Sequence, residues 1–168
     1  MISQLSDFLR LTLSGSGEAE ITLADEVRFA RQYLEIERVR FGDRLAVTIE
    51  VAPEVESLRV PALILLPIVE NAVRHAVERN ERGGEITIRA SLHENALRLS
   101  VTDDGPGGAA VPIAGSGIGL SNTRARLHQL FGSQQLLRRS SLENGGSEYL
   151  MEIPARYGAQ SHAQLVDA

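Results

Sequence analysis

The chain has 168 residues, which suits a single domain, and 43% of them are hydrophobic, a share typical of a packed core rather than of a disordered chain. A formal net charge of −5 argues against direct, nonspecific nucleic-acid binding, and the lack of cysteine excludes disulfides and thiolate metal sites. The longest strongly apolar stretch, 60–69, is about half of the roughly 20 residues that cross a bilayer, so we expect a soluble domain.

Two helices are predicted ahead of residue 45. Apolar residues recur at helical spacing over 1–14, which indicates a short amphipathic helix, and the Ser-Gly pairs at 14–17 break it. Thr22 is placed to cap a second helix, whose first turn is acidic and whose apolar stripe continues to a stop at Gly42.

A strand and a third helix are predicted next. Residues 45–51 alternate between apolar and polar, as expected for a strand with one buried face. Pro61 is well placed to begin the following helix, which Pro67 would kink from inside and which Gly83 would stop.

The remainder predicts two hairpins and a fourth helix. Strands at 86–90 and 97–101 pair across a turn, a glycine-rich loop from 103 to 119 precedes a helix that ends at Phe131, and a last hairpin joins 135–140 to 148–153. We therefore predict an α+β fold, a two-layer α/β sandwich whose mixed, mostly antiparallel sheet carries its helices on one face.

Three segments contain residues suited to chemistry. The first is 70–76 on the apolar third helix, where Asn71, Arg74 and His75 share one side next to Glu70. Polar groups on so apolar a helix must satisfy hydrogen bonds or bind a ligand, although an ordinary boundary between buried and solvated faces explains them equally well.

The second segment places Asp103 at a strand end, followed by Gly105 and Gly107. A carboxylate in this position can accept a hydrogen bond from an exocyclic amine, and glycines let the backbone approach a flat ring or a phosphate. A plain Asp-Gly turn is the alternative for this segment alone.

The third segment opens the fourth helix with alternating glycines, Gly115, Gly117 and Gly119, followed by Leu120. Free backbone amides at a helix N-terminus bind anions. The pattern is neither a P-loop nor the dinucleotide fingerprint, because no Gly-Lys-Ser/Thr follows it and no strand leads directly into it. Taken alone, it also fits a glycine-rich surface loop.

Together, and in this order, the three segments resemble the Bergerat-type ATP-binding fold shared by gyrase, the large heat-shock chaperone, histidine kinases and mismatch-repair proteins, over about 45–154. Segments 33–45, 60–72 and 117–127 are similar to LytS-like sensor histidine kinases. This resemblance implies a remnant of a dimerisation helix at 1–14, a linker and preceding helix at 15–44, an ATP-binding domain at 45–155 and a loose tail at 156–168.

The resemblance also implies roles for the site residues. Asn71 would bind a Mg²⁺ that bridges the ATP phosphates, Arg74 would contact phosphate, His75 would shape the pocket, and Glu70 would act near the metal or support its ligand. Asp103 would bind the adenine amino group, helped through water by Ser147. The remaining predicted nucleotide contacts lie around the purine or in a phosphate-covering lid and its base: Gly105, Gly107, Gly115, Gly117, Gly119, Leu120, Asn122 and Arg126. Residues 109–116 of this lid are expected to be ordered by Mg-ATP.

Two departures from the family pattern bear on the reaction. Hydrolases of this superfamily place a general-base Glu one helical turn before the Asn, where this chain has Pro67. None of the histidines, His75, His93, His128 and His162, has the Pro-His-Phe setting of the family's phospho-acceptor. The acceptor is therefore expected outside this chain, on a dimerisation hairpin of which 1–14 resembles the second helix.

The resemblance thus implies a histidine kinase catalytic domain that uses ATP and Mg²⁺, phosphorylates a histidine elsewhere, and so supplies a phosphoryl group to a response regulator, one of the LytTR type. It implies a cytoplasmic domain of a membrane-anchored protein, and a monomer or weak dimer for this stretch alone. Two alternatives stay open: a non-catalytic nucleotide-binding scaffold and an ATP-driven hydrolase, against which Pro67 counts.

Overall fold

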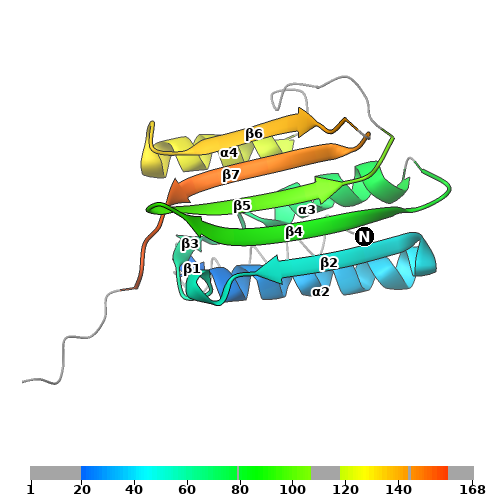
Figure 1. Ribbon diagram of the computed structural model, residues 1–168, viewed down its shortest axis with the longest axis horizontal. Coiled ribbons are helices and arrows are strands. Elements are labelled where there is room, and N and C mark those ends of the chain that lie inside the picture. Colours follow the sequence, from blue (N-terminus) through cyan, green and yellow to red (C-terminus); the bar gives the residue numbers. More distant parts are fainter. Residues whose placement is uncertain (1–19, 79, 107–117, 144, 159–168) are drawn as a thin grey trace, which may run out of the picture.

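The computed structural model describes residues 20–78, 80–106, 118–143 and 145–158. These residues form two layers, a five-stranded sheet in the order β2-β4-β5-β7-β6 and the helices α2, α3 and α4 on one of its faces (Figure 1). Strands β2 and β4 pair in parallel and all other neighbours in this sheet are antiparallel. The predicted fold class is confirmed.

The helices and strands follow one another along the chain in a simple order. They are β1 Glu20–Thr22, α2 Leu23–Phe41, β2 Leu45–Val51, β3 Arg59–Pro61, α3 Leu66–Val73, β4 Gly84–His93, β5 Ala96–Asp103, α4 Ile118–Phe131, β6 Leu136–Ser141 and β7 Ser147–Pro154. A separate two-stranded sheet pairs β1 with β3. Both predicted hairpins are present, as β4–β5 and β6–β7.

Helix α2 begins where its capping residue predicts. The Thr22 hydroxyl accepts a hydrogen bond from the backbone N–H of Asp25 at 3.1 Å, which satisfies one of the free donors of the first turn. Gly42 follows the helix with a φ of 58°, a conformation that favours glycine.

The predicted start of the third helix is wrong. Pro61 lies in β3, opposite Glu20, and the helix begins only at Leu66. Between them, Leu63 adopts a φ of 59°, which turns the chain sharply. The predicted kink at Pro67 is also wrong, because Pro67 stands in the first turn of α3, where its missing N–H would have had no helical partner. Strands β1 and β3 were not predicted, because each has only three residues, too few to show a periodic pattern.

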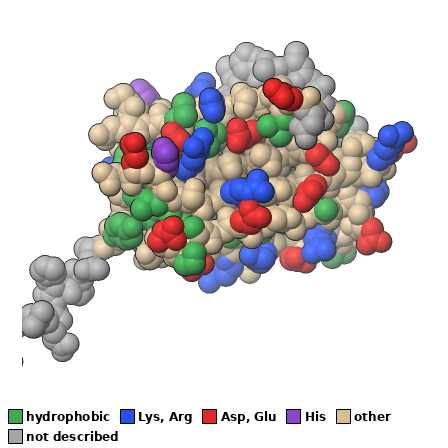
Figure 2. Space-filling view, viewed as in Figure 1, with side chains coloured by type: hydrophobic (Ala, Val, Ile, Leu, Met, Phe, Trp, Pro, Cys, Tyr) green, Lys and Arg blue, Asp and Glu red, His purple; other side chains and the backbone are tan. Residues whose placement is uncertain are grey.

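The core lies between the sheet and the helices. Inward-facing residues of the central strands are almost fully buried, among them Ile86, Ile88, Leu97, Leu99 and Val101. The opposite face of the sheet is polar, and Figure 2 shows acidic and basic side chains spread over it. Within the described ranges, no helix is long and apolar enough to cross a membrane.

Candidate functional site

Asp103 is a buried carboxylate at the end of β5, with 2% of its surface exposed. Its Oδ1 accepts a hydrogen bond from the backbone N–H of Gly105 at 3.1 Å. Its Oδ2 is buried and has no hydrogen-bond partner among the described residues. Since a buried acceptor is costly unless it is satisfied, Oδ2 fits an N–H donor supplied by a ligand.

Burial raises the pKa of Asp103 to about 6, against the opposing effects of the Gly105 N–H and the Arg139 guanidinium. The carboxylate is therefore ionised at pH 7 and mostly protonated at pH 5. We expect ATP affinity to be about tenfold weaker at pH 5 than at pH 7. At one pH unit below the pKa only about a tenth of the carboxylate is ionised, which costs about 1.4 kcal/mol of binding free energy. Calorimetric titrations at both pH values measure this change.

The matched variant for this pH prediction is Asp103→Asn, whose side chain does not titrate. Protonation of the ATP phosphates affects wild type and variant alike, so the difference between their pH profiles isolates Asp103. Parallel profiles would show that Asp103 does not control the pH dependence of binding.

The turn after Asp103 is in close backbone contact with the end of α3. A Cβ added at Gly105 would overlap the carbonyl oxygen and carbon of His75, and one at Gly146 would overlap the carbonyl oxygen of Asp103. The glycines thus allow three chain segments to meet around the Asp103 carboxylate.

Gly105→Ala is therefore expected to push the turn away from α3 and to weaken ATP binding about tenfold or more, since even small displacements of positioning groups are costly. The matched variant is Gly132→Ala, whose Cβ would meet nothing within 4 Å although its φ is 56°. That variant should lose about 1 kcal/mol of folding stability from its left-handed backbone and keep its ATP affinity. Equal affinities for both variants in calorimetry would refute the packing argument.

Asn71 lies in α3 with 6% of its surface exposed. Its Nδ2 donates a hydrogen bond to the carbonyl oxygen of Pro67 at 2.7 Å, one helical turn earlier. The orientation leaves Oδ1 as the group available to a ligand, because none of the described residues donates a hydrogen bond to it. Glu70 beside it is half-buried.

Helix α3 continues into a π-helical turn, Arg74–Glu78, which carries two more predicted residues. Such wide turns are rare and often occur at functional sites. Arg74 is exposed and therefore accessible to an anion, whereas His75 is half-buried. The Nδ1 of His75 lies 3.2 Å from the hydroxyl of Tyr149 and 3.2 Å from a guanidinium nitrogen of Arg139.

Sequence reasoning missed Arg139. From β6, its guanidinium donates to the Ser147 hydroxyl at 2.9 Å and stacks 5.5 Å from the centre of the Tyr149 ring. Burial raises the pKa of Tyr149 to about 12, so the phenol stays neutral beside His75. Arg139 thus contacts Ser147 and His75, and it lowers the pKa of Asp103 electrostatically. Only the register of β6 against β7 reveals this position, since Arg139 faces Tyr149 across the pair.

Helix α4 brings part of the third predicted segment to the same region. Leu120 is fully buried, Asn122 is exposed, and Gly119 stands where an added Cβ would touch the Pro67 side chain at 3.4 Å. Arg126 donates a hydrogen bond to the carbonyl oxygen of Ala62. Gly107, Gly115, Gly117 and the predicted lid at 109–116 lie outside the described residues.

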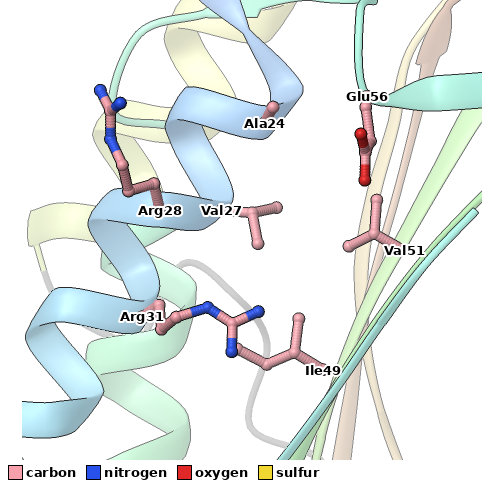
Figure 3. A pocket seen from close by; sticks show the side chains of 7 residues that line it. All are labelled: Ala24, Val27, Arg28, Arg31, Ile49, Val51 and Glu56. Carbon is pink, nitrogen blue, oxygen red and sulfur yellow. The ribbon is translucent and has the colours of Figure 1, made fainter. Parts of the chain in front are cut away.

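A separate groove lies between α2 and the edge strand β2. It is lined by Ala24, Val27, Arg28, Arg31, Ile49, Val51 and Glu56. Figure 3 shows the Arg31 side chain extending from α2 toward Ile49 on the strand. This groove contains none of the residues predicted for nucleotide binding, so it is not part of the candidate site.

Models of two known protein families match this chain, one near each end. A family model described as "Histidine kinase-, DNA gyrase B-, and HSP90-like ATPase" matches residues 59–157, and one described as "Histidine kinase" matches residues 1–45. The nucleotide-free catalytic domain of the histidine kinase ThkA superimposes with a TM-score of 0.62 at 23% identity, over 83% of this chain and 97% of that one. This likeness shows the fold.

The curated relatives of this chain include sensor histidine kinases and sensor proteins. The chain is 33% identical over 159 residues to the sensor histidine kinase YesM of Bacillus subtilis, covering 93% of this chain and 27% of that protein. It is 28% identical over 165 residues to the sensor protein LytS of Enterococcus faecalis, covering 92% and 28%. It thus spans about a quarter of their length. The chain belongs to the histidine kinase-, DNA gyrase B- and HSP90-like ATPase family, and the predicted resemblance to LytS-like sensor histidine kinases is confirmed.

Proposed function

We propose that this chain is the ATP-binding catalytic domain of a two-component sensor histidine kinase. It would transfer the γ-phosphoryl group of ATP to a histidine outside this chain, from which a response regulator takes it. The observation that supports this proposal most is the buried Oδ2 of Asp103, which has no hydrogen-bond partner among the described residues and lies beside the glycine turn that meets the end of α3.

At the nucleotide's base end, Asp103 would accept a hydrogen bond from the exocyclic amine of adenine. The arginine and hydroxyl next to it, Arg139 and Ser147, are joined by a 2.9 Å hydrogen bond and so present a fixed polar wall. Adenine carries the amine that this acceptor requires, whereas guanine presents a carbonyl oxygen at the equivalent ring position, so the site favours ATP over GTP.

At the phosphate end, the donor set fits a magnesium ion shared with the substrate. Within the described residues there is no group of three His, Cys, Asp or Glu side chains that could hold a metal by itself. A single amide oxygen, Oδ1 of Asn71, suits a hydrated Mg²⁺ that is held mainly by phosphates and water. When bound, the ion neutralises charge on the phosphates, and exposed Arg74 would add a second positive charge.

The transfer needs little chemistry from the protein. A neutral imidazole nitrogen of the acceptor forms a bond to the γ-phosphorus while the bond from that phosphorus to the bridging oxygen of ADP breaks, and the imidazole later releases its proton to solvent. Hydrolysis instead requires a base to activate water. Pro67 occupies the position one turn before Asn71 and cannot accept a proton, which supports transfer over hydrolysis.

The wider assignments rest on the resemblance to LytS-like sensor histidine kinases. We propose that the acceptor histidine lies on a dimerisation hairpin, that the whole protein is anchored in the cell membrane with this domain in the cytoplasm, and that its response regulator is of the LytTR type. For residues 1–168 alone we propose a monomer or a weak dimer.

Incubation of this chain with γ-labelled ATP, Mg²⁺ and the dimerisation hairpin of the whole protein tests the proposal. We expect an acid-labile, base-stable label on the hairpin, as a phosphohistidine gives. Nucleotide binding without label transfer would favour the scaffold alternative, and release of labelled phosphate at the same rate without the hairpin would favour the hydrolase.

A further inference from the structure

Glu26 is a buried carboxylate for which the nucleotide-binding motifs do not account. It stands in the first turn of α2 with 1% of its surface exposed. One of its oxygens accepts a hydrogen bond from the backbone N–H of Leu63 at 2.8 Å, and the other accepts one from Leu65 at 2.9 Å. A single side chain therefore holds the turn between β3 and α3 by two hydrogen bonds.

This turn has an unusual backbone and a second anchor. Leu63 has a φ of 59°, which costs energy for a residue with a Cβ and persists only where neighbouring contacts impose it. From α4, Arg126 donates a hydrogen bond to the carbonyl oxygen of Ala62 and also lowers the pKa of Glu26 electrostatically. The turn at 62–65 is thus held by α2 on one side and by α4 on the other.

The turn also fixes the first turn of the helix that carries Asn71. The backbone N–H groups of Ile68 and Val69 donate to the carbonyl oxygen of Leu65 at 3.0 and 3.1 Å. The next residues of α3 include Pro67, whose carbonyl oxygen holds the Asn71 amide at 2.7 Å. A displacement of the turn would therefore change the direction of Asn71 Oδ1.

We propose that Glu26 is a positioning residue that couples helix α2 to the phosphate end of the nucleotide site, by holding the 62–65 turn in register with α3 and α4. The inference rests on the proposed function, because it assigns Asn71 to the metal. Helix α2 lies in the predicted linker between the dimerisation segment 1–14 and the ATP-binding domain, so a movement of α2 would reach Asn71 and Arg126 through the hydrogen bonds of this carboxylate to the 62–65 turn.

A matched variant separates positioning from general stabilisation. Glu37 lies on the same helix, is also 1% exposed, and has its pKa raised by burial, but it pairs with Arg40 at 3.6 Å and makes no hydrogen bond to the turn. Burial raises the pKa of Glu26 to about 7, so neutral Glu26 is already well populated at neutral pH. Glu26→Gln is therefore expected to fold.

The experiment compares ATP binding with Mg²⁺ and with a chelator in wild type, Glu26→Gln and Glu37→Gln. We expect Glu26→Gln to weaken Mg-ATP binding about 10-fold to 100-fold, the usual effect of losing a residue that orients a metal ligand, and to leave Mg²⁺-free binding within about twofold. Glu37→Gln should change neither. In an Asn71→Ala background, Glu26→Gln should cause no further loss. Equal losses with and without Mg²⁺, or additive losses, would overturn the proposal.

Hydrogen exchange on the nucleotide-free chain decides the question by a second route. We expect Glu26→Gln, compared with wild type and Glu37→Gln, to raise exchange through 66–71 and in α4 as well as at Leu63 and Leu65. Exchange that rises only at those two amides would overturn the coupling. A wild-type chain without any Mg²⁺-dependent binding would refute the proposed function instead, and the exchange result would still decide whether Glu26 couples the helices.

Discussion

Asp103→Asn is expected to reduce the ATP affinity of this chain about 100-fold at pH 7. The substitution keeps the shape of the side chain and its acceptor for the Gly105 N–H, but it turns an amide N–H₂ toward the exocyclic amine of adenine, so two donors face each other. Loss of a hydrogen bond to a charged group, about 1.5–3 kcal/mol, accounts for most of that factor. Calorimetric titration with Mg-ATP measures it.

Folding stability provides the control for this variant. Because burial raises the pKa of Asp103 from 3.8 to about 6, the ionised carboxylate is stabilised less in the folded chain than in the unfolded one, and stability falls as pH rises from about 4 through 6. Removing the charge should therefore leave stability at pH 7 unchanged or slightly higher. A variant that loses ATP binding because it unfolds would contradict this account.

The neighbouring carboxylate offers a matched substitution. Asp104 is exposed, and its Oδ1 accepts a hydrogen bond from the backbone N–H of Glu85 at 2.6 Å. Asp104→Asn removes the same charge one residue away and keeps an acceptor for that bond. We expect its ATP affinity to stay within about threefold of wild type, since exposed charges are well screened. Equal losses for both variants would indicate a general effect of charge.

Asn71→Ala is expected to lower the rate of phosphoryl transfer about 100-fold or more and to abolish the effect of Mg²⁺ on ATP binding. The variant loses the one amide oxygen proposed to bind the metal, and with it the positioning of the phosphates. Binding in the presence of a chelator should stay close to wild type, because Asp103 and the glycine turn are untouched. Transfer to the dimerisation hairpin and calorimetry with and without Mg²⁺ measure the two effects.

The two substitutions together form a cross-check on the site. Asp103→Asn should weaken ATP binding both with Mg²⁺ and with a chelator, whereas Asn71→Ala should weaken ATP binding only when Mg²⁺ is present. If Asn71→Ala weakened Mg²⁺-free binding as strongly, then Asn71 would act through its hydrogen bond to Pro67, as part of the fold rather than as a metal ligand.

Local signals made much of the fold predictable. The Thr22 cap and the Gly42 stop bound α2 because each acts within a single helical turn, and both hairpins follow from alternation and short turns. The prediction failed at Pro61, where the same residue type suits a helix start and a strand. Its place in β3 depends on a pairing with Glu20, about 40 residues away, which local sequence does not encode.

In the candidate site, too, residues in local motifs could be predicted, and residues positioned by distant elements could not. Asp103 and Asn71 could be predicted as candidates because their motifs are contiguous, and the structure brings their segments together where Gly105 meets the backbone of His75. Arg139 and Glu26 could not, since each gains its position from a partner element: β7 for Arg139, and the 62–65 turn for Glu26. Acidic residues are common in the first turn of a helix. Only the burial of Glu26 indicates that this glutamate has a further role.

The parallel pairing of β2 with β4 has a consequence for how this domain folds. Because parallel neighbours need a long connection, the chain between Val51 and Gly84, which contains α3, must cross behind the sheet before the two strands can pair (Figure 1). The antiparallel hairpins close over short loops and can form first, at a lower entropic cost. We therefore expect the pairing of β2 with β4, and with it the packing of α3 on the sheet, to be completed after the hairpins have formed. Because the proposed ATP contacts of Asn71 depend on α3, bound ATP would stabilise the native state more than the folding transition state, and it would slow unfolding more than it would speed folding.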